Sequence, residues 1–171
     1  VRANVSIKLS QMGLEMDLEF CLSLMRAILE KAKEHSNFVR VDMEGSALTE
    51  RTLKAYQRLF SDYKNVGIVL QSYLHRSEGD ARELAALHAP VRVCKGAYKE
   101  PASIAYRKME DIRKSFKRMV EILLQGGSKV GIATHDEKLI RWAMDWTDAE
   151  KISKDRFEFQ MLYGLRRKRA R

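Results

Sequence analysis

Short apolar runs alternate with longer amphipathic segments along this chain, and this alternation limits its fold more than any other feature. The runs are rich in β-branched residues, and several are apolar throughout, as is typical of strands buried on both faces of a sheet. Each intervening segment has room for one helix. The predicted strands cover Val5–Leu9, Phe38–Asp42, Val66–Gln71, Val91–Lys95, Lys129–Ala133 and Phe157–Leu162.

The intervening segments carry apolar residues at helical spacing, which predicts one buried face on each helix. Asp17, Thr49 and Thr147 are predicted to start helices, the last of them within a capping-box pattern that ends at Glu150. The pair Gly126 and Gly127 is predicted to end the long helix that precedes the fifth predicted strand. The clearest stripe consists of Met109, Ile112, Phe116, Val120 and Leu123.

Repetition of strand and then helix predicts parallel strands joined by right-handed crossovers, in an open sheet or a closed barrel. A dinucleotide-binding open sheet has a GxGxxG turn that opens a helix, whereas the glycines within residues 126–131 precede a strand. We therefore expect an α/β fold, a (β/α)8 TIM-type barrel. We expect it to be incomplete, because six strands are predicted here and a complete barrel has eight in about 250 residues.

Composition fits a globular protein with one barrel domain over residues 1–164 and a basic tail over residues 165–171. The formal net charge is +9, but five positive charges fall within the last six residues. We interpret this tail as a solvated end and expect no nucleic-acid partner, because no basic and aromatic surface motif is visible. The two cysteines, Cys21 and Cys94, form no CxxC pair and are compatible with a reducing cytoplasm.

Polar and charged residues follow every predicted strand. In parallel α/β folds the carboxyl ends of the strands converge on the functional face, so these residues are expected to form one ring. Each member alone has a structural explanation, such as helix capping or a Lys8–Asp42 ion pair, but the complete set favours function. The ring comprises Lys8, Asp42, Met43, Glu44, Gln71, Tyr73, Arg92, Lys95–Tyr98, Thr134–Asp136, Glu158, Gln160, Tyr163 and Gly164.

Several chemistries are compatible with such a ring. A Schiff-base lyase of the aldolase kind could use Lys8 or Lys95, which lie at strand ends. A non-catalytic binding module driven by the basic tail is a further alternative. No metal site is expected, since the four histidines have no ligand spacing, and no GxSxG elbow or P-loop occurs.

Six strings at the strand ends resemble the monofunctional bacterial proline dehydrogenases, in order and from Val5 to Gly164. The resemblance implies an FAD enzyme that oxidises L-proline to 1-pyrroline-5-carboxylate and passes electrons to a quinone, with peripheral contact at the inner face of a membrane. The strings are Val5–Leu9, Arg40–Glu44, Val69–Leu74, Arg92–Tyr98, Ala133–Asp136 and Phe157–Gly164.

The resemblance also assigns roles to individual residues. Asp42 and Arg92 match active-site positions that we expect to be catalytic, and Lys8 and Tyr163 match positions on the substrate side. The positions expected to contact FAD are Met43, Gln71, Lys95, Gly96, Ala97, Thr134, His135 and Glu158.

The sequence departs from the family pattern at both ends. The family continues after its Leu-Tyr-Gly string with a final strand and a helix whose paired arginines bind the proline carboxylate. Here the doublet Arg166 and Arg167 comes directly after the sixth predicted strand and is not equated with that pair. We therefore expect residues 1–171 alone to be weakly active or inactive, and we expect self-association through the open edges of the barrel.

Overall fold

The computed structural model describes residues 4–164. These residues form two compact units. The first contains residues 4–69 together with Tyr98–Glu100, and the second contains residues 70–97 and 101–164. The predicted tail over residues 165–171 lies outside the described residues.

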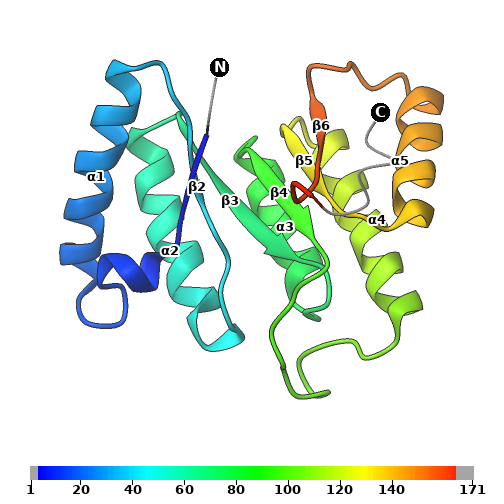
Figure 1. Ribbon diagram of the computed structural model, residues 1–171, viewed down its shortest axis with the longest axis horizontal. Coiled ribbons are helices and arrows are strands. Elements are labelled where there is room, and N and C mark those ends of the chain that lie inside the picture. The colour runs from blue at the N-terminus through cyan, green and yellow to red at the C-terminus, as the bar shows by residue number, and fades with distance from the viewer. Residues whose placement is uncertain (1–3, 165–171) are drawn as a thin grey trace. The chain divides into compact units, whose positions relative to one another are not determined.

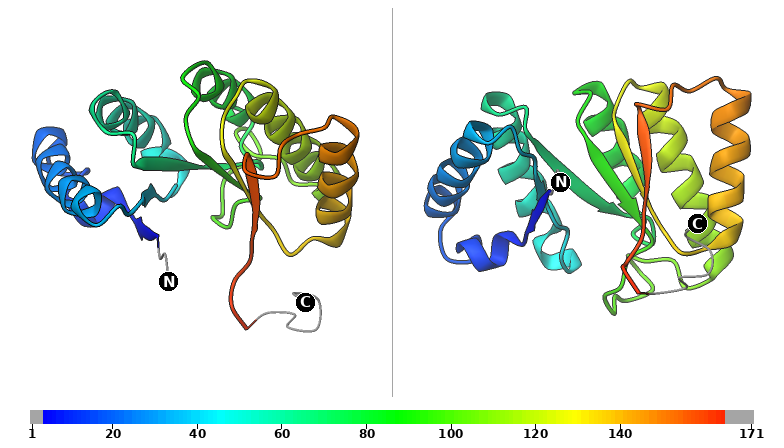
Figure 2. Two further views of the ribbon diagram at one scale, coloured as in Figure 1. Left: turned by 90° about the horizontal axis from the view of Figure 1, so that it is seen from above. Right: turned by 45° about the horizontal axis from the view of Figure 1, so that its top comes forward.

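The first unit is a parallel sheet covered by helices. Strand β1 (Val5–Ile7) pairs with β2 (Val39–Val41), and β2 pairs with β3 (Val66–Gln71). A short 3-10 helix, η1 (Leu9–Met12), follows β1, and helices α1 (Leu18–Glu34) and α2 (Ser46–Asp62) complete the unit. Both α-helices lie on the same face of the strands (Figures 1 and 2).

Apolar packing and two capping contacts define the helices of the first unit. The buried faces of α1 and α2 contribute Cys21, Met25 and Tyr56 to the core. Asp17 caps α1 as predicted, because its carboxylate accepts a hydrogen bond from the backbone N–H of Phe20 at 2.7 Å.

The start of α2 is held by a residue that is distant in sequence. The carboxylate of Glu100 accepts hydrogen bonds from Ser46, at 2.7 Å from the backbone N–H and 2.6 Å from the hydroxyl. These bonds lower the pKa of Glu100, and its negative charge is favourable beside the positive end of the helix dipole.

The second unit repeats the same construction. Strand β4 (Val91–Cys94) pairs in parallel with β5 (Val130–Ala133), which pairs with β6 (Phe157–Gln160). The last two residues of β3 belong to this unit, and the backbone just after them, at Ser72, donates to the carbonyl of Cys94 at 2.8 Å. Helices α3 (Ser77–Ala86), α4 (Met109–Gln125) and α5 (Glu137–Ala149) lie on one face of these strands (Figure 2).

Helix α4 shows why the periodic pattern predicted a helix. Phe116, Val120 and Leu123 of the predicted stripe are fully buried, as is Met119 beside them, whereas Met109 at the start of the helix is exposed. The helix ends at Gln125, and the following Gly127 has a φ of 91°, a left-handed conformation that favours glycine. The predicted end at the glycine pair is therefore confirmed.

Two predicted helix starts are wrong. Helix α2 begins at Ser46, so Thr49 lies buried within its first turns. Thr147 lies near the end of α5, where its hydroxyl donates to the carbonyl of Ala143 at 2.7 Å. A hydroxyl that bonds to the backbone one turn earlier belongs to the helix interior and not to a cap.

The predicted strands are all present, and most are shorter at their carboxyl ends than predicted. Lys8, Asp42 and Lys95 thus lie just beyond the last residue of a strand. No helix within residues 4–164 combines the length and the apolar character needed to cross a bilayer.

Candidate functional site

The predicted ring divides between the two units, and the first unit contains an ion pair between two of its members. Lys8 follows β1 and Asp42 follows β2, and because these strands are parallel neighbours the two side chains meet at their carboxyl ends. The Lys8 Nζ lies 3.6 Å from an Asp42 carboxylate oxygen. Both side chains keep contact with solvent, so the pair remains accessible to a ligand. Met43, next in the chain, is buried.

Glu44 holds the turn that carries Lys8. Its carboxylate accepts a hydrogen bond from the backbone N–H of Ser10 at 3.1 Å and another from the Ser10 hydroxyl at 2.6 Å. Glu44 is buried, and these bonds help to satisfy its carboxylate oxygens. The ends of β1 and β2 are therefore tied together beside the Lys8–Asp42 pair.

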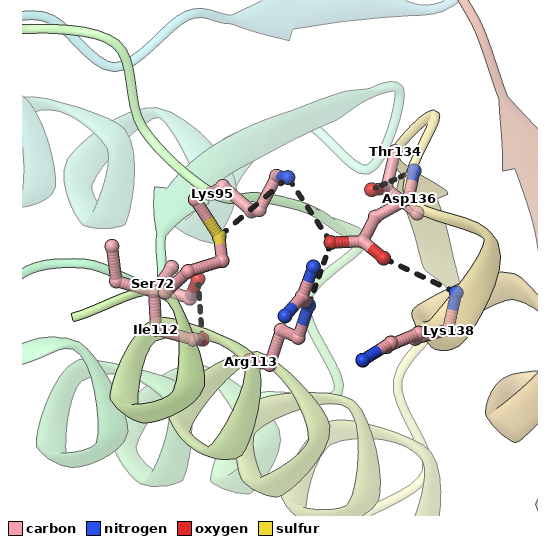
Figure 3. A network of polar contacts seen from close by, with 8 residues as sticks. Ser72, Lys95, Ile112, Arg113, Thr134, Asp136 and Lys138 are labelled. Carbon is pink, nitrogen blue, oxygen red and sulfur yellow. Dashed lines mark hydrogen bonds and ion pairs between the residues drawn. The ribbon is translucent and has the colours of Figure 1, made fainter.

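Asp136 is the centre of the polar network in the second unit. One carboxylate oxygen lies 2.8 Å from Arg113 Nε and 3.3 Å from Lys95 Nζ (Figure 3). The other oxygen accepts from the backbone N–H of Lys138 at 3.1 Å and thereby caps α5. The Asp136 side chain is only 6% exposed, whereas Lys95 and Arg113 are about one-third exposed.

The protonation of Asp136 reflects this environment. Burial raises the pKa of the carboxyl, but the hydrogen bonds and charges of Arg113 and Lys95 outweigh burial and hold the pKa below its ordinary value. The backbone N–H of Asp136 also donates to the hydroxyl of the buried Thr134 at 3.1 Å. Asp136 is therefore an anion that fixes two cations at the end of β5.

A pocket of about 710 Å³ opens beside this network. Its size lies within the range of ligand pockets, about 300–1,000 Å³. His135 lines it, and the ring Nε2 accepts a hydrogen bond from the backbone N–H of Leu162 at 3.0 Å. A neutral His135 therefore carries its proton on Nδ1. The remaining lining residues are Lys95, Arg113, Ala133, Thr134, Asp136, Glu137 and Lys138.

Gly96 follows Lys95 at a point where no side chain fits. Its φ is 104°, and an added Cβ would lie 2.2 Å from a ring carbon of the buried Tyr73. Glycine is thus required here by backbone conformation and by the close approach of Tyr73. The neighbouring Ala97 is exposed.

Arg92 on β4 is oriented by Gln160 on β6, and the strand between them, β5, has a glycine at the paired position. Arg92, Gly131 and Glu158 stand at paired positions on β4, β5 and β6. The Nε of Arg92 donates to the Gln160 side-chain oxygen, and the Gln160 amide donates to the carboxylate of Glu158 at 2.5 Å. A Cβ on Gly131 would lie 2.7 Å from the Gln160 amide nitrogen, so the glycine leaves the space that Gln160 occupies.

The other predicted residues of the second unit lie apart from the Asp136 network. Gln71 is buried at the end of β3, where its backbone carbonyl accepts from the Ser77 hydroxyl at 2.6 Å. Tyr163 is 94% exposed. Arg166 and Arg167 lie outside the described residues.

Three residues that organise the site were not among the predicted binding residues. Asp136 stands in the Thr134–Asp136 string at a strand end, so its position was a usable signal. Arg113 lies near the start of α4, one turn after Met109, whose sulfur is 3.9 Å from Lys95 Nζ. No pattern in the sequence pointed from this helix to the site. Gly131 was likewise missed, because its role depends on the pairing register.

Comparison with known proteins identifies the family. The family profile described as "Proline dehydrogenase" matches residues 1–170. Proline dehydrogenase of Deinococcus radiodurans is 41% identical over 172 residues, with 98% of this chain and 56% of that protein covered. Proline dehydrogenase 2 of Bacillus subtilis is 36% identical over 166 residues, with 97% and 55% covered. The chain thus spans about half the length of these relatives.

Solved structures agree with this assignment. The crystal structure of proline utilization A from Bdellovibrio bacteriovorus, inactivated by N-propargylglycine, matches with a TM-score of 0.83 and 25% identity, covering 93% of this chain and 20% of that one. The match confirms the predicted α/β barrel class, with six strands among the described residues. From its sequence and its fold, the chain belongs to the proline dehydrogenase family.

Proposed function

We propose that this chain contributes to the FAD-dependent oxidation of L-proline to 1-pyrroline-5-carboxylate, with electrons passed to a quinone. Family membership and the names of the relatives support the reaction. We assign FAD binding to the second unit. The observation that supports this assignment is the pocket at the end of β5, where Asp136 holds Lys95 and Arg113 at the edge.

The residues of this pocket fit FAD. A flavin dinucleotide carries a diphosphate, and Lys95 and Arg113 supply two cations beside a volume of about 710 Å³. Thr134 and His135 add polar groups to the pocket. At Gly96 the absence of a side chain lets the backbone lie close to the ring of Tyr73. When bound, the flavin would supply the acceptor for the hydride equivalent that leaves the proline carbon next to nitrogen.

The Lys8–Asp42 pair suits a zwitterionic amino acid. The Lys8 ammonium is complementary to a carboxylate, and the Asp42 carboxylate is complementary to the N–H groups of a secondary amine. Their 3.6 Å separation leaves each side chain able to turn toward a substrate. We assign to this pair the orientation of proline, which accounts for much of a protein's part in flavin chemistry.

Arg92 would act as a fixed positive charge. Its Nε is held by Gln160, so the guanidinium keeps its orientation without help from the substrate. A fixed cation beside the cofactor favours its gain of electrons. Met43, Gln71, Ala97, Glu158 and Tyr163 keep the cofactor and substrate contacts that their motifs imply, as part of the same proposal.

The partners and the activity of residues 1–171 alone belong to this proposal as well. The chain spans 55–56% of its relatives, and we propose that it turns proline over weakly by itself and self-associates along its strand edges. We further propose a cytoplasmic protein that meets its quinone acceptor by peripheral contact with the membrane.

The direct test is proline-dependent bleaching of bound flavin. FAD-loaded protein is mixed with L-proline without oxygen, and the flavin absorbance is followed against Asp42→Asn and Lys8→Met. The proposal predicts slow bleaching by wild type and at least about a tenfold slower rate in both variants, since each loses a charge-assisted contact worth about 1.5–3 kcal/mol. Wild-type bleaching that is unaffected by both substitutions would contradict these roles.

A Schiff-base lyase is the competing proposal. It rests on Lys8 and Lys95 at the strand ends. Borohydride treatment in the presence of a carbonyl substrate would trap a covalent adduct on one of these lysines, detectable as a mass increase. We expect no adduct, because each lysine is engaged by a carboxylate, at 3.6 and 3.3 Å.

A further inference from the structure

A second hollow lies between α4 and α5, next to the pocket described above. It has a volume of about 570 Å³ and is lined by Glu110, Arg113, Lys114, Lys117 and Lys138. We call these five residues and the space between them the α4–α5 groove. Four cationic side chains face one carboxylate there, an imbalance that needs an explanation because like charges repel.

The three lysines of the groove are not neutralised by the protein. Within residues 4–164, Lys114, Lys117 and Lys138 form no ion pair with an acidic side chain. The remaining cation, Arg113, is different, because its Nε is bound to Asp136. That bond holds the guanidinium at the boundary between pocket and groove, with its terminal nitrogens left for another acceptor.

Lys117 is also held in place. Its Nζ lies 5.2 Å from the ring centroid of Trp142, within the range of a cation–π contact. Trp142 in turn stacks on Trp146, at 5.8 Å between ring centroids. Two of the four cations are thus positioned by contacts of their own before any ligand arrives, which reduces the entropy lost on binding.

We propose that the α4–α5 groove binds a phosphate-bearing anion of the size of a diphosphate. Arginine and lysine are the usual ligands of phosphate oxygens, and a concave cluster of one charge sign concentrates the opposite ion. The diphosphate has two sources of the same chemistry. It belongs either to the flavin dinucleotide in the adjoining pocket, a source that rests on the proposed function, or to a separate phosphate-bearing molecule.

The experiment uses the tryptophans as reporters. The chain has two tryptophans, both on α5, and Lys117 contacts one of them. Inorganic diphosphate is titrated into the flavin-free protein at low salt while tryptophan fluorescence is recorded, and isothermal titration calorimetry gives the same dissociation constant independently. We expect saturable binding that weakens as sodium chloride is raised.

The variants separate a built site from general attraction to a basic protein. Lys114→Gln leaves in place Lys117, the lysine that lies over Trp142. It is expected to raise the dissociation constant about three- to tenfold, since one charge-assisted contact is lost. The control is Lys33→Gln, an exposed helical lysine of the first unit, which should leave the constant unchanged. An absence of saturable binding, or equal effects of the two substitutions, would overturn the proposal.

Flavins then identify the source of the diphosphate. If FAD competes with diphosphate and riboflavin does not, the groove holds the diphosphate of the dinucleotide. If diphosphate binds equally well at saturating FAD, the groove takes a separate ligand. Binding of diphosphate by a protein that does not bind FAD would contradict the proposed function and leave the groove proposal standing.

Discussion

Among single residues of the second unit, Asp136 combines two ion pairs with a helix cap. It pairs with Lys95 and Arg113 and caps α5 while almost completely buried. Replacing it by Asn keeps the cap and the shape but removes the charge. We expect Asp136→Asn to lower the free energy of unfolding by about 1–3 kcal/mol at pH 7, because two charge-assisted bonds lose their anion. Urea titration measures this, with the exposed Asp145→Asn on α5 as the control.

The pH dependence of that loss follows from the direction of the pKa shift. The pKa of folded Asp136 lies below the ordinary value of 3.8, so the unfolded chain binds more protons between the two values. The stability contributed by Asp136 is therefore present above pH 3.8 and is lost as pH falls through the folded pKa. The difference between wild type and Asp136→Asn should shrink toward pH 3, about one unit below the ordinary range. If the stability difference between wild type and Asp136→Asn does not change with pH, the negative charge of Asp136 is not what stabilises the fold.

Gly96 allows a sharp test with a matched control. Gly96→Ala forces a non-glycine residue to a φ of 104° and places a Cβ 2.2 Å from Tyr73. We expect a loss of about 2–4 kcal/mol in the free energy of unfolding, from strain and overpacking together. Gly79→Ala, in α3 with no atom within 4 Å of the new Cβ, should be stabilising by about 0.5–1 kcal/mol. Similar shifts of the urea midpoint by both substitutions would contradict the close packing of Gly96 against Tyr73.

One rule drawn from the sequence, that polar residues at strand ends converge, accounts for two contacts in the structure. The rule suggested a Lys8–Asp42 pair and put Lys95 and Asp136 in the same ring, and in the structure Lys8 contacts Asp42 and Lys95 contacts Asp136. It missed Arg113, because the rule says nothing about which turn of a helix faces a neighbouring loop. Such a contact depends on how the helix packs, which the periodic pattern leaves undetermined.

At the scale of elements, the register of β4, β5 and β6 decides the environment of Arg92. Gly131→Ala fits the strand backbone but meets the Gln160 side chain at 2.7 Å. We expect a change in stability below about 1 kcal/mol, because Gln160 can move. We also expect weaker flavin affinity, because Arg92 loses the hydrogen bond that Gln160 accepts from its Nε. The matched control is Gln160→Ala, which removes the partner directly.

The double variant makes this prediction specific. If Gly131→Ala acts through Gln160, then Gly131→Ala with Gln160→Ala should weaken flavin binding no more than Gln160→Ala alone. If the loss of flavin affinity in the double variant equals the sum of the losses in the two single variants, Gly131 does not act through Gln160.

Element types were more predictable than element starts. Every predicted strand is present, because buried parallel strands need apolar residues on both faces and few other segments of this chain have them. The starts at Thr49 and Thr147 were wrong because a lone hydroxyl can bond within a helix as well as at its cap. Helix α2 instead begins where Glu100 binds Ser46, a partner 54 residues away that no local pattern reveals.

At the scale of the whole molecule, the alternation of strand and helix was sufficient for the fold class, and the order of six strings for the family. Both conclusions agree with relatives at 36–41% identity and with a solved structure at a TM-score of 0.83. Sequence could not divide the described residues into two units, since that division depends on contacts between distant segments.

We propose that the second unit holds a flavin dinucleotide beside the Asp136 network. The most direct test of this proposal is an FAD titration of this chain followed by quenching of flavin fluorescence, with Lys95→Met as the variant and Lys33→Met as the control. We predict saturable binding by wild type and by the control, and an affinity at least about tenfold weaker in Lys95→Met. Failure of the folded wild-type chain to bind FAD, or equal binding by all three proteins, would contradict the claim.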